Sequence, residues 1–226
     1  MAKKRISDVL IEVLANAGIE RIYGITGDSL NSVNDSLRRN GKIAFEHVRH
    51  EETAAFAAGA EASLTGKLTV CAGSSGPGNL HLINGLFDCH RNRVPVLAIA
   101  SHIPQSEVGL NYFQETHPEN LFKECSCFCE LVSNPKQMPE ILFRAMNAAV
   151  GNQDVAVIVL PGDVAVMETE IDELPVWHHP RLPHIVPQRE DIEEMAAHLE
   201  KGERITLFCG AGCEGAHDEV VELAKR

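Results

Sequence analysis

The sequence contains neither a long apolar run nor an apolar leader segment. Its uninterrupted apolar stretches stay below the roughly 18 residues that a membrane-spanning helix needs, so we expect no transmembrane segment. Residues 1–5 are basic but lead into an amphipathic pattern, which argues against a signal peptide. Both absences favour a cytoplasmic protein.

Basic residues are also scarce. Lysine and arginine number 20 against 32 aspartates and glutamates, which gives a net charge of −12. Such a surface repels nucleic acid, and no basic stripe offsets it, so we expect no nucleic-acid partner.

The sequence also lacks an even number of cysteines, which a complete set of disulfides would need. Seven cysteines favour a reducing compartment over a disulfide framework.

Three cysteines, Cys125, Cys127 and Cys129, alternate along the chain. On a strand they would share one face. Their spacing matches no common zinc motif, so we interpret them as small buried apolar side chains and predict no metal site.

Helical and strand-like patterns alternate along most of the chain, which predicts an α/β fold with a doubly wound parallel sheet covered on both faces. Ser7 is the expected cap of the first helix, and Gly18 closes it. Four later helices are predicted. One ends near Gly41, one begins at Glu51, and two cover residues 79–92 and 135–150. The predicted strands cover residues 21–25, 43–47, 68–72, 94–100, 127–132 and 155–160.

Composition changes after Val166. Residues 174–188 hold four prolines and three histidines with little periodicity, which is typical of an interdomain linker. Beyond it we predict a helix over residues 189–202, a strand over 205–209, and a helix that still runs at Arg226. We therefore expect one domain over residues 1–180, and the incomplete start of a second α/β domain over residues 181–226.

Glu51 stands where a predicted strand ends and a helix begins, at the carboxyl edge of the sheet. Ligands of parallel sheets bind at this edge. A carboxylate there can exchange a proton with a ring nitrogen of a flat ligand. The alternative is an exposed acid that stabilises a helix N-terminus, and spacing alone favours this alternative. Glu52 is expected to be the solvated neighbour.

Glycine-rich turns follow two of the predicted strands. Gly76, Pro77, Gly78 and Asn79 would let backbone amides approach a ligand at a helix N-terminus. The alternative is an ordinary tight turn, and no Gly-Lys-Ser/Thr ending makes it a phosphate loop. Gly27 begins a similar turn, where Asp28 or Ser29 is expected to cap the next helix.

A long polar connection covers residues 101–120, and loops of this length are often functional. Phe113 and Gln114 either line a small-substrate pocket, or Phe113 pins the loop to the core; the pattern favours neither. His90 is interpreted as a satisfied structural histidine. Gly210, Gly212 and Gly215 match part of a dinucleotide-binding fingerprint, which is a weak signal alone.

Taken together, these motifs resemble the thiamine-diphosphate-dependent enzymes related to acetolactate synthase, and within them the group of pyruvate oxidase and pyruvate:quinone dehydrogenase. The resemblance covers essentially the whole chain as the N-terminal portion of such an enzyme. It rests on Tyr-Gly-Ile-Thr-Gly-Asp at residues 23–28, Arg-His-Glu-Glu at 49–52, Gly-Pro-Gly-Asn-Leu-His-Leu at 76–82, and Phe-Gln-Glu-Thr-His at 113–117.

The resemblance implies a pyrimidine-binding domain in which Glu51 bonds the pyrimidine N1′ of thiamine diphosphate. It places Gly27, Gly76, Pro77, Gly78 and Asn79 near the cofactor, and Phe113 and Gln114 near the substrate. It implies oxidative decarboxylation of pyruvate to acetate and carbon dioxide, with electrons passing through FAD to ubiquinone or menaquinone. The second domain would be the start of the FAD-binding domain.

The resemblance also implies a homodimer or homotetramer, peripheral at the inner face of the cell membrane when full-length. The family's Gly-Asp-Gly plus Asn motif for Mg²⁺ and the diphosphate is absent from these residues, so the metal ligands are expected outside this chain. We therefore expect the isolated chain to be inactive. Two alternatives stay open: part of an acetolactate synthase-like enzyme, and a non-catalytic binding or assembly module that keeps the fold.

Overall fold

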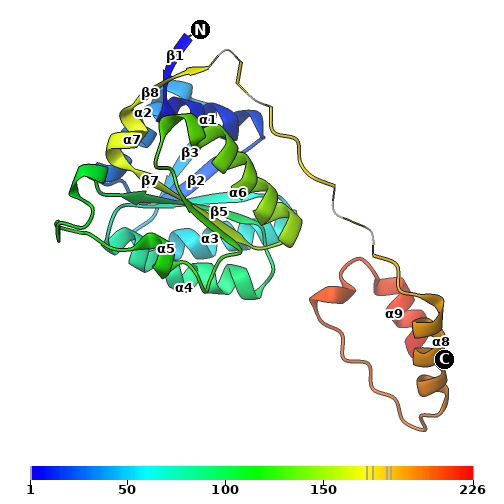
Figure 1. Ribbon diagram of the computed structural model, residues 1–226. Helices are drawn as coiled ribbons and strands as arrows, with labels where there is room; N and C mark the ends of the chain where they lie inside the picture. Colours follow the sequence, from blue (N-terminus) through cyan, green and yellow to red (C-terminus); the bar gives the residue numbers. More distant parts are fainter. Residues whose placement is uncertain (1, 172, 175, 182, 184, 226) are drawn as a thin grey trace. The chain divides into compact units, whose positions relative to one another are not determined.

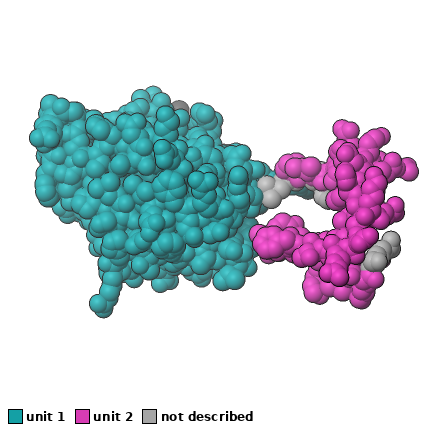
Figure 2. All heavy atoms as spheres, turned by 90° about the horizontal axis from the view of Figure 1, so that it is seen from below, with its two compact units in different colours: residues 1–182 teal, residues 183–226 magenta. Residues whose placement is uncertain are grey.

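The computed structural model describes residues 2–171, 173–174, 176–181, 183 and 185–225. The chain divides into two compact units, residues 1–182 and 183–226, coloured teal and magenta in Figure 2. Some expectations lie outside the described residues: those for Pro175, Leu182 and His184 in the linker, and for Arg226 at the end of the last helix. The identity of the second unit as an FAD-binding domain stays a prediction.

A six-stranded sheet forms the centre of the first unit, and all of its strand pairs are parallel (Figure 1). The strand order is β3-β2-β4-β5-β7-β6. This confirms the predicted α/β fold. In chain order the strands are β2 (Arg21–Gly24), β3 (Ala44–His47), β4 (Thr69–Gly73), β5 (Val96–His102), β6 (Phe128–Leu131) and β7 (Val155–Pro161).

Helices cover both faces of the sheet, as a buried parallel sheet requires. Along β5, Leu97 and Ile99 join the core formed with one group of helices, whereas Val96, Ala98 and Ala100 join the other core. The first core includes α1 (Ile6–Asn16), α2 (Asn31–Asn40), α6 (Met138–Asn152) and α7 (Gly162–Val166), and the second includes α3 (Glu51–Thr65) and α4 (Pro77–Arg91).

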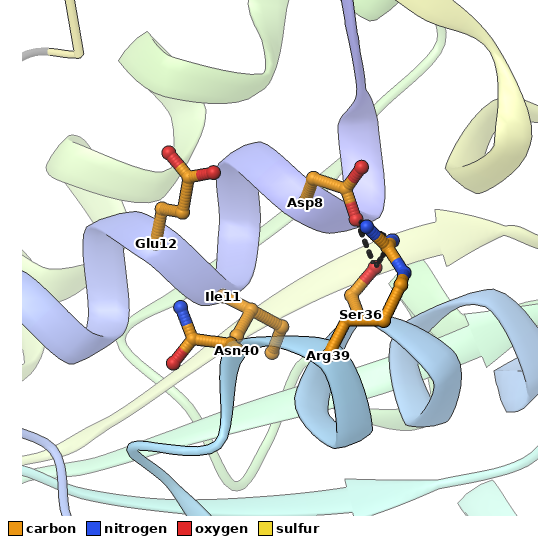
Figure 3. Close-up of a pocket in the computed structure, with 6 residues that line it drawn as sticks. All are labelled: Asp8, Ile11, Glu12, Ser36, Arg39 and Asn40. Atoms are coloured by element: carbon orange, nitrogen blue, oxygen red, sulfur yellow. Dashed lines mark hydrogen bonds and ion pairs between the residues drawn. The ribbon is translucent and has the colours of Figure 1, made fainter.

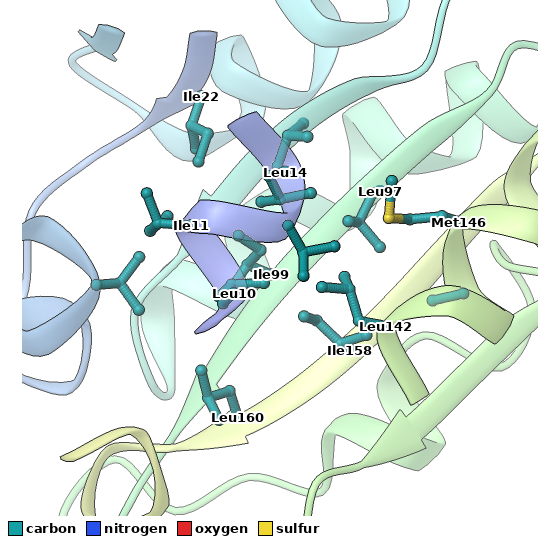
Figure 4. Packing of buried hydrophobic residues seen from close by; sticks show 14 of the residues in the cluster. Leu10, Ile11, Leu14, Ile22, Leu97, Ile99, Leu142, Met146, Ile158 and Leu160 are labelled. Carbon is teal, nitrogen blue, oxygen red and sulfur yellow. The ribbon is translucent and has the colours of Figure 1, made fainter. Parts of the chain in front are cut away.

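Figure 4 shows the larger core, in which Leu10 and Leu14 of α1 lie near Ile99 and Leu142. In the smaller core, α3 and α4 approach each other closely because small residues face one another. A Cβ atom on Gly85 would come within 2.6 Å of the Ala55 Cβ, and one on Gly59 would come within 2.6 Å of the Cys89 sulfur. The alanines and glycines of α3 therefore serve contact with α4.

The N-terminus differs from the sequence prediction. β1 (Ala2–Arg5) forms a two-stranded antiparallel sheet with β8 (Glu168–Ile171), which the pattern of residues did not indicate. Their register places Lys3 opposite Glu170 and Arg5 opposite Glu168, and such opposite charges stabilise a strand pair. The predicted Ser7 cap is wrong, because α1 begins at Ile6. Ser7 is buried and accepts a 3.0 Å hydrogen bond from the Ser36 hydroxyl.

The second unit contains α8 (Arg189–Glu200) and α9 (His217–Ala224), with a single 3₁₀ turn between them at Ala211–Cys213. The strand predicted over residues 205–209 is wrong: this segment has no regular secondary structure, and Phe208 is 99% exposed. A parallel strand needs a neighbour, and the described residues of this unit supply none. The glycines at 210, 212 and 215 therefore lack the strand–turn–helix context that a dinucleotide site requires.

The interpretation of the three alternating cysteines as buried apolar side chains is confirmed for Cys125 and is wrong for Cys127, which is exposed, while Cys129 is half-buried. They do not share a strand face, because of the three only Cys129 lies on β6. Burial raises the pKa of Cys125 to about 11 and that of Cys129 to about 12, so both are neutral thiols at physiological pH.

Among the described helices, none is both long and apolar enough to cross a membrane.

Charged side chains connect β1, α1 and α2. Asp35 accepts hydrogen bonds from Arg5 at 2.7 Å, Arg38 at 2.9 Å and Arg39 at 3.0 Å. Arg39 also bonds Asp8, and these residues border a hollow of about 120 Å³ lined by Asp8, Ile11, Glu12, Ser36, Arg39 and Asn40 (Figure 3). Bonds from Arg5, then Arg38 and Arg39, hold the pKa of Asp35 well below its usual range.

This arginine cluster predicts a loss of stability in acid. A carboxyl whose pKa is lower in the folded state contributes stability above its unfolded pKa of about 3.9, and loses it as the pH falls further. We expect the urea midpoint to fall as the pH drops from about 5 to about 2, and to fall less steeply in Asp35→Asn. Asp88→Asn, in α4, is the control and should keep the wild-type slope. Parallel slopes for wild type and Asp35→Asn would contradict the prediction.

Candidate cofactor-binding site

The site predicted from the sequence lies at the carboxyl edge of the sheet, where β2, β4 and β5 end at Gly24, Gly73 and His102. The turn after β4 leads into α4, and α3 begins beside it. Because all three strands run in the same direction, their following turns meet at one edge. The two α-helices that begin here are those packed most closely through glycine and alanine.

Glu51 is the first residue of α3 and is only 7% exposed. Its Oε2 lies 3.0 Å from the Nδ1 of His81 in α4. The ring of His81 stacks on that of His50, with centroids 4.3 Å apart, and His50 caps α3 by accepting a 3.3 Å bond from the Glu52 amide. The alternative of an exposed acid at a helix N-terminus is therefore wrong.

Glu52 differs from its neighbour. Its side chain is 36% exposed, against 9% for that of Glu51. Its carboxylate receives a hydrogen bond from the Asn84 amide on the surface of α4. The expectation that Glu52 is the more solvated of the two acids is confirmed.

The glycine turn after β4 has little room for side chains. Gly76 has a φ of +68° and a ψ of −112°, and Pro77 follows as the first residue of α4. A Cβ atom on Gly78 would lie 2.8 Å from the Ser74 hydroxyl and 3.1 Å from the Glu51 Oε1. Glycine at position 78 therefore lets the second carboxylate oxygen of Glu51 lie close to bare backbone.

The turn after β2 packs directly against this glycine turn. A Cβ atom on Gly27 would come within 2.6 Å of the Ser74 Cβ. The predicted helix cap at Asp28 or Ser29 is wrong, since neither side chain caps the 3₁₀ turn Asp28–Leu30 or the helix α2. Instead, the Ser29 hydroxyl accepts a 2.9 Å hydrogen bond from the Ser75 amide and holds the two turns together.

Asn79 is fully buried, and its amide nitrogen donates a 2.7 Å hydrogen bond to the Ser101 carbonyl near the end of β5. Its Oδ1 has no hydrogen-bond partner among the described residues; nor have the buried His102 Nδ1 and Thr116 Oγ1. Burial lowers the pKa of His102, which keeps its imidazole neutral at physiological pH. Buried polar atoms without partners are expected where a polar ligand or ordered water completes the hydrogen bonding.

The loop between β5 and α5 (Pro118–Leu121) extends away from the sheet, in green in Figure 1. Phe113 is 80% exposed, so it does not pin the loop to the core. Gln114 contacts the glycine turn: a Cβ atom on Gly76 would lie 2.7 Å from the Gln114 Cβ, and the Ser75 hydroxyl donates a 3.3 Å bond to the Gln114 Oε1. Of the two predicted substrate residues, the structure brings Gln114 to the site.

Three residues of this edge were missed by the sequence interpretation of the site: His81, Ser29 and Ser75. Each acts through a contact between segments far apart in the chain, for which the local sequence pattern gives no signal.

His90 has a hydrogen-bond partner, as predicted: its Nδ1 lies 2.8 Å from Asp154. Two surface hollows lie elsewhere: the one in Figure 3, and one of about 110 Å³ beside Arg21, Glu61 and Thr69 at the opposite edge of the sheet.

Comparison with known proteins gives a match over residues 4–121 to the family "Thiamine pyrophosphate enzyme, N-terminal TPP binding domain". The whole chain is 58% identical to an uncharacterized 42.6 kDa protein of Pseudomonas amyloderamosa and covers 57% of its length. Over 96% of its length, the chain is 33% identical to a pyruvate oxidase of Lactiplantibacillus plantarum and covers 36% of that protein. Over its full length, it is 32% identical to an acetolactate synthase of Arthrospira platensis and covers 41% of that protein. The chain thus spans between about a third and three fifths of the length of these relatives.

Proposed function

The chain belongs to the thiamine pyrophosphate enzymes, whose N-terminal cofactor-binding domain it carries, and we propose that it supplies the pyrimidine half-site for oxidative decarboxylation of pyruvate to acetate and carbon dioxide. One observation carries this proposal. Glu51 is buried at the carboxyl edge of the sheet, with one oxygen on His81 and the other facing Gly78. Because this acid is shielded from bulk water, it is suited to exchange a proton with a ring nitrogen of a bound ligand.

The residues present fit thiamine diphosphate. When bound, this cofactor supplies the electron sink for cleavage of the bond between a ketone and a carboxylate. Glu51 would bond the pyrimidine nitrogen, and the backbone of Gly27, Gly76, Pro77, Gly78 and Asn79 would line the cofactor. The close packing at glycines 27, 76 and 78 supports this, because it keeps bare backbone at this edge: any side chain there would overlap Ser74, Gln114 or Glu51.

Substrate contacts are proposed for Gln114 and Phe113. Gln114 lies against the glycine turn beside Ser75, whereas Phe113 presents its ring to solvent. FAD, Mg²⁺, a quinone acceptor and a homodimer or homotetramer complete the proposal for the whole enzyme. They rest on the resemblance of the sequence motifs, and we assign no metal ligand to the described residues.

A second candidate is an acetolactate synthase-type reaction, in which pyruvate is condensed instead of oxidised. The identity of 32% to an acetolactate synthase is close to the 33% to a pyruvate oxidase, so identity does not separate them. The non-catalytic alternative predicts that Glu51→Gln leaves the cellular function intact.

Product analysis separates these functions. The protein as its gene encodes it, supplied with thiamine diphosphate, Mg²⁺ and FAD, should convert pyruvate to acetate and carbon dioxide while reducing ferricyanide. Each pyruvate consumes one water and releases two electrons and two protons. Acetolactate as the product, without ferricyanide reduction, would replace the proposal with the second candidate. Cofactor binding without either product would favour the non-catalytic module.

A further inference from the structure

The loop of residues 103–117 holds a defined conformation with little regular secondary structure. Outside the 3₁₀ turn Gln105–Glu107, three of its residues adopt left-handed backbone angles: Gly109 with φ +86°, Asn111 with φ +56° and Gln114 with φ +66°. Left-handed angles are unfavourable for residues other than glycine unless surrounding contacts impose them. Something in the loop must therefore hold Gln114 in this conformation.

Glu115 makes the contacts that can do so. Its Oε1 accepts a 2.5 Å hydrogen bond from the Gly109 amide, and its Oε2 accepts a 3.1 Å bond from the Tyr112 amide. Its own amide donates a 2.9 Å bond to the Tyr112 carbonyl. One carboxylate thus ties the two ends of the loop tip together. Hydrogen bonds from the amides, that of Gly109 first, lower the pKa of Glu115, so the group is anionic at neutral pH.

Gln114 lies between this closed tip and the glycine turn. It immediately precedes Glu115, and its Cβ would lie 2.7 Å from a Cβ on Gly76. The Ser75 hydroxyl is 3.3 Å from its side-chain oxygen. The placement of Gln114 therefore depends on the residue after it, because the main chain at Gln114 cannot relax while Glu115 is bonded to two amides.

We propose that Glu115 is the positioning residue of this loop: its carboxylate closes residues 109–115 into a rigid tip and so presents Gln114 at the glycine turn. Among the described residues Glu115 makes no hydrogen bond to Gly76 or Ser75, so it acts through Gln114. The effect on substrate rests on the proposed function, in which Gln114 contacts the 2-oxo acid. The effect on the conformation of the loop is independent of the proposed function.

The test uses Glu115→Ala and Glu115→Asp in the protein as its gene encodes it, loaded with thiamine diphosphate. Glu107→Ala is the matched control: this acid lies in the same loop, and its main chain, not its carboxylate, bonds Pro104 and Leu110. Deuterium exchange at the amides of Gly109 and Tyr112 should accelerate about tenfold or more in Glu115→Ala, as expected for loss of a charge-assisted bond. Exchange should change less in Glu115→Asp, and it should match wild type in Glu107→Ala.

Kinetics provides the second readout. In Glu115→Ala the KM for pyruvate should rise about three- to thirtyfold, which corresponds to loss of one oriented contact, while the Kd for thiamine diphosphate changes less than about twofold. Glu115→Asp should recover part of the KM. Unchanged exchange at both amides would overturn the proposal. Faster exchange with an unaltered KM would support Glu115 as the residue that closes the tip and would overturn the substrate contact of Gln114. A wild-type protein without turnover would instead overturn the proposed function, and the exchange result would still decide whether Glu115 organises the loop.

Discussion

Glu51→Gln is expected to lower the turnover of pyruvate by about 10²–10⁴-fold, the range for removal of one positioned proton-transfer group. The amide has nearly the size of the carboxyl and can keep the contact with His81, but it cannot exchange a proton with a ring nitrogen. The fold should be unaffected, because the substitution leaves the buried volume unchanged. Turnover is measured with saturating cofactor, so that weaker binding alone does not lower the rate.

The control for this prediction is Glu52→Gln. Glu52 follows Glu51 directly, but its side chain is 36% exposed and contacts Asn84 on the helix surface. Its turnover should stay within about twofold of wild type, as expected for a surface substitution. Calorimetry with thiamine diphosphate and the thermal midpoint are compared in all three proteins. If Glu51→Gln kept more than a tenth of the wild-type turnover, Glu51 would not be the proton-exchanging acid.

The positions of most strands along the chain were predictable, because these strands are short apolar runs between polar turns. β5 illustrates both the success and its limit: all seven of its residues are buried, as a central parallel strand requires, yet it begins at Val96 and not at the predicted Val94. Glu51 was a candidate from the sequence because it stands between a predicted strand and a predicted helix, although spacing alone favoured an exposed acid. Its burial was not predictable, since the burial depends on His81 and Gly78, which lie in the next helix along the chain.

Other features depend on partners that a local pattern does not reveal. β1 forms because Glu168 and Glu170 lie opposite its basic residues, more than 160 positions along the chain. Conversely, residues 205–209 have a strand-like composition but no partner strand among the described residues, so their composition alone does not produce a strand. Ser29 looked like a cap, but its hydroxyl bonds Ser75 in another turn.

The second large effect is expected from Gly76→Ala. Two costs combine at this position. With a φ of +68° and a ψ of −112°, Gly76 lies outside the left-handed region that alanine can enter, so the backbone is unfavourable for alanine by at least about 1–2 kcal/mol. The new methyl would also lie 2.7 Å from the Gln114 Cβ and 2.9 Å from its carbonyl oxygen, an overlap that costs about 1–3 kcal/mol. We expect a total loss of about 2–5 kcal/mol in the free energy of unfolding from urea titration, and displacement of Gln114 from the glycine turn.

Gly66→Ala is the control without overlap. Gly66 caps the C-terminus of α3 with a φ of +66° and a ψ of 10°, in the left-handed region, and a Cβ atom there would meet nothing within 4 Å. It should therefore lose only about 1–2 kcal/mol from backbone strain and keep the wild-type KM for pyruvate. Gly76→Ala should raise this KM as well, because the loop that carries Gln114 must move. Equal losses of stability in both variants, with no change in KM, would show that Gln114 does not rest on Gly76.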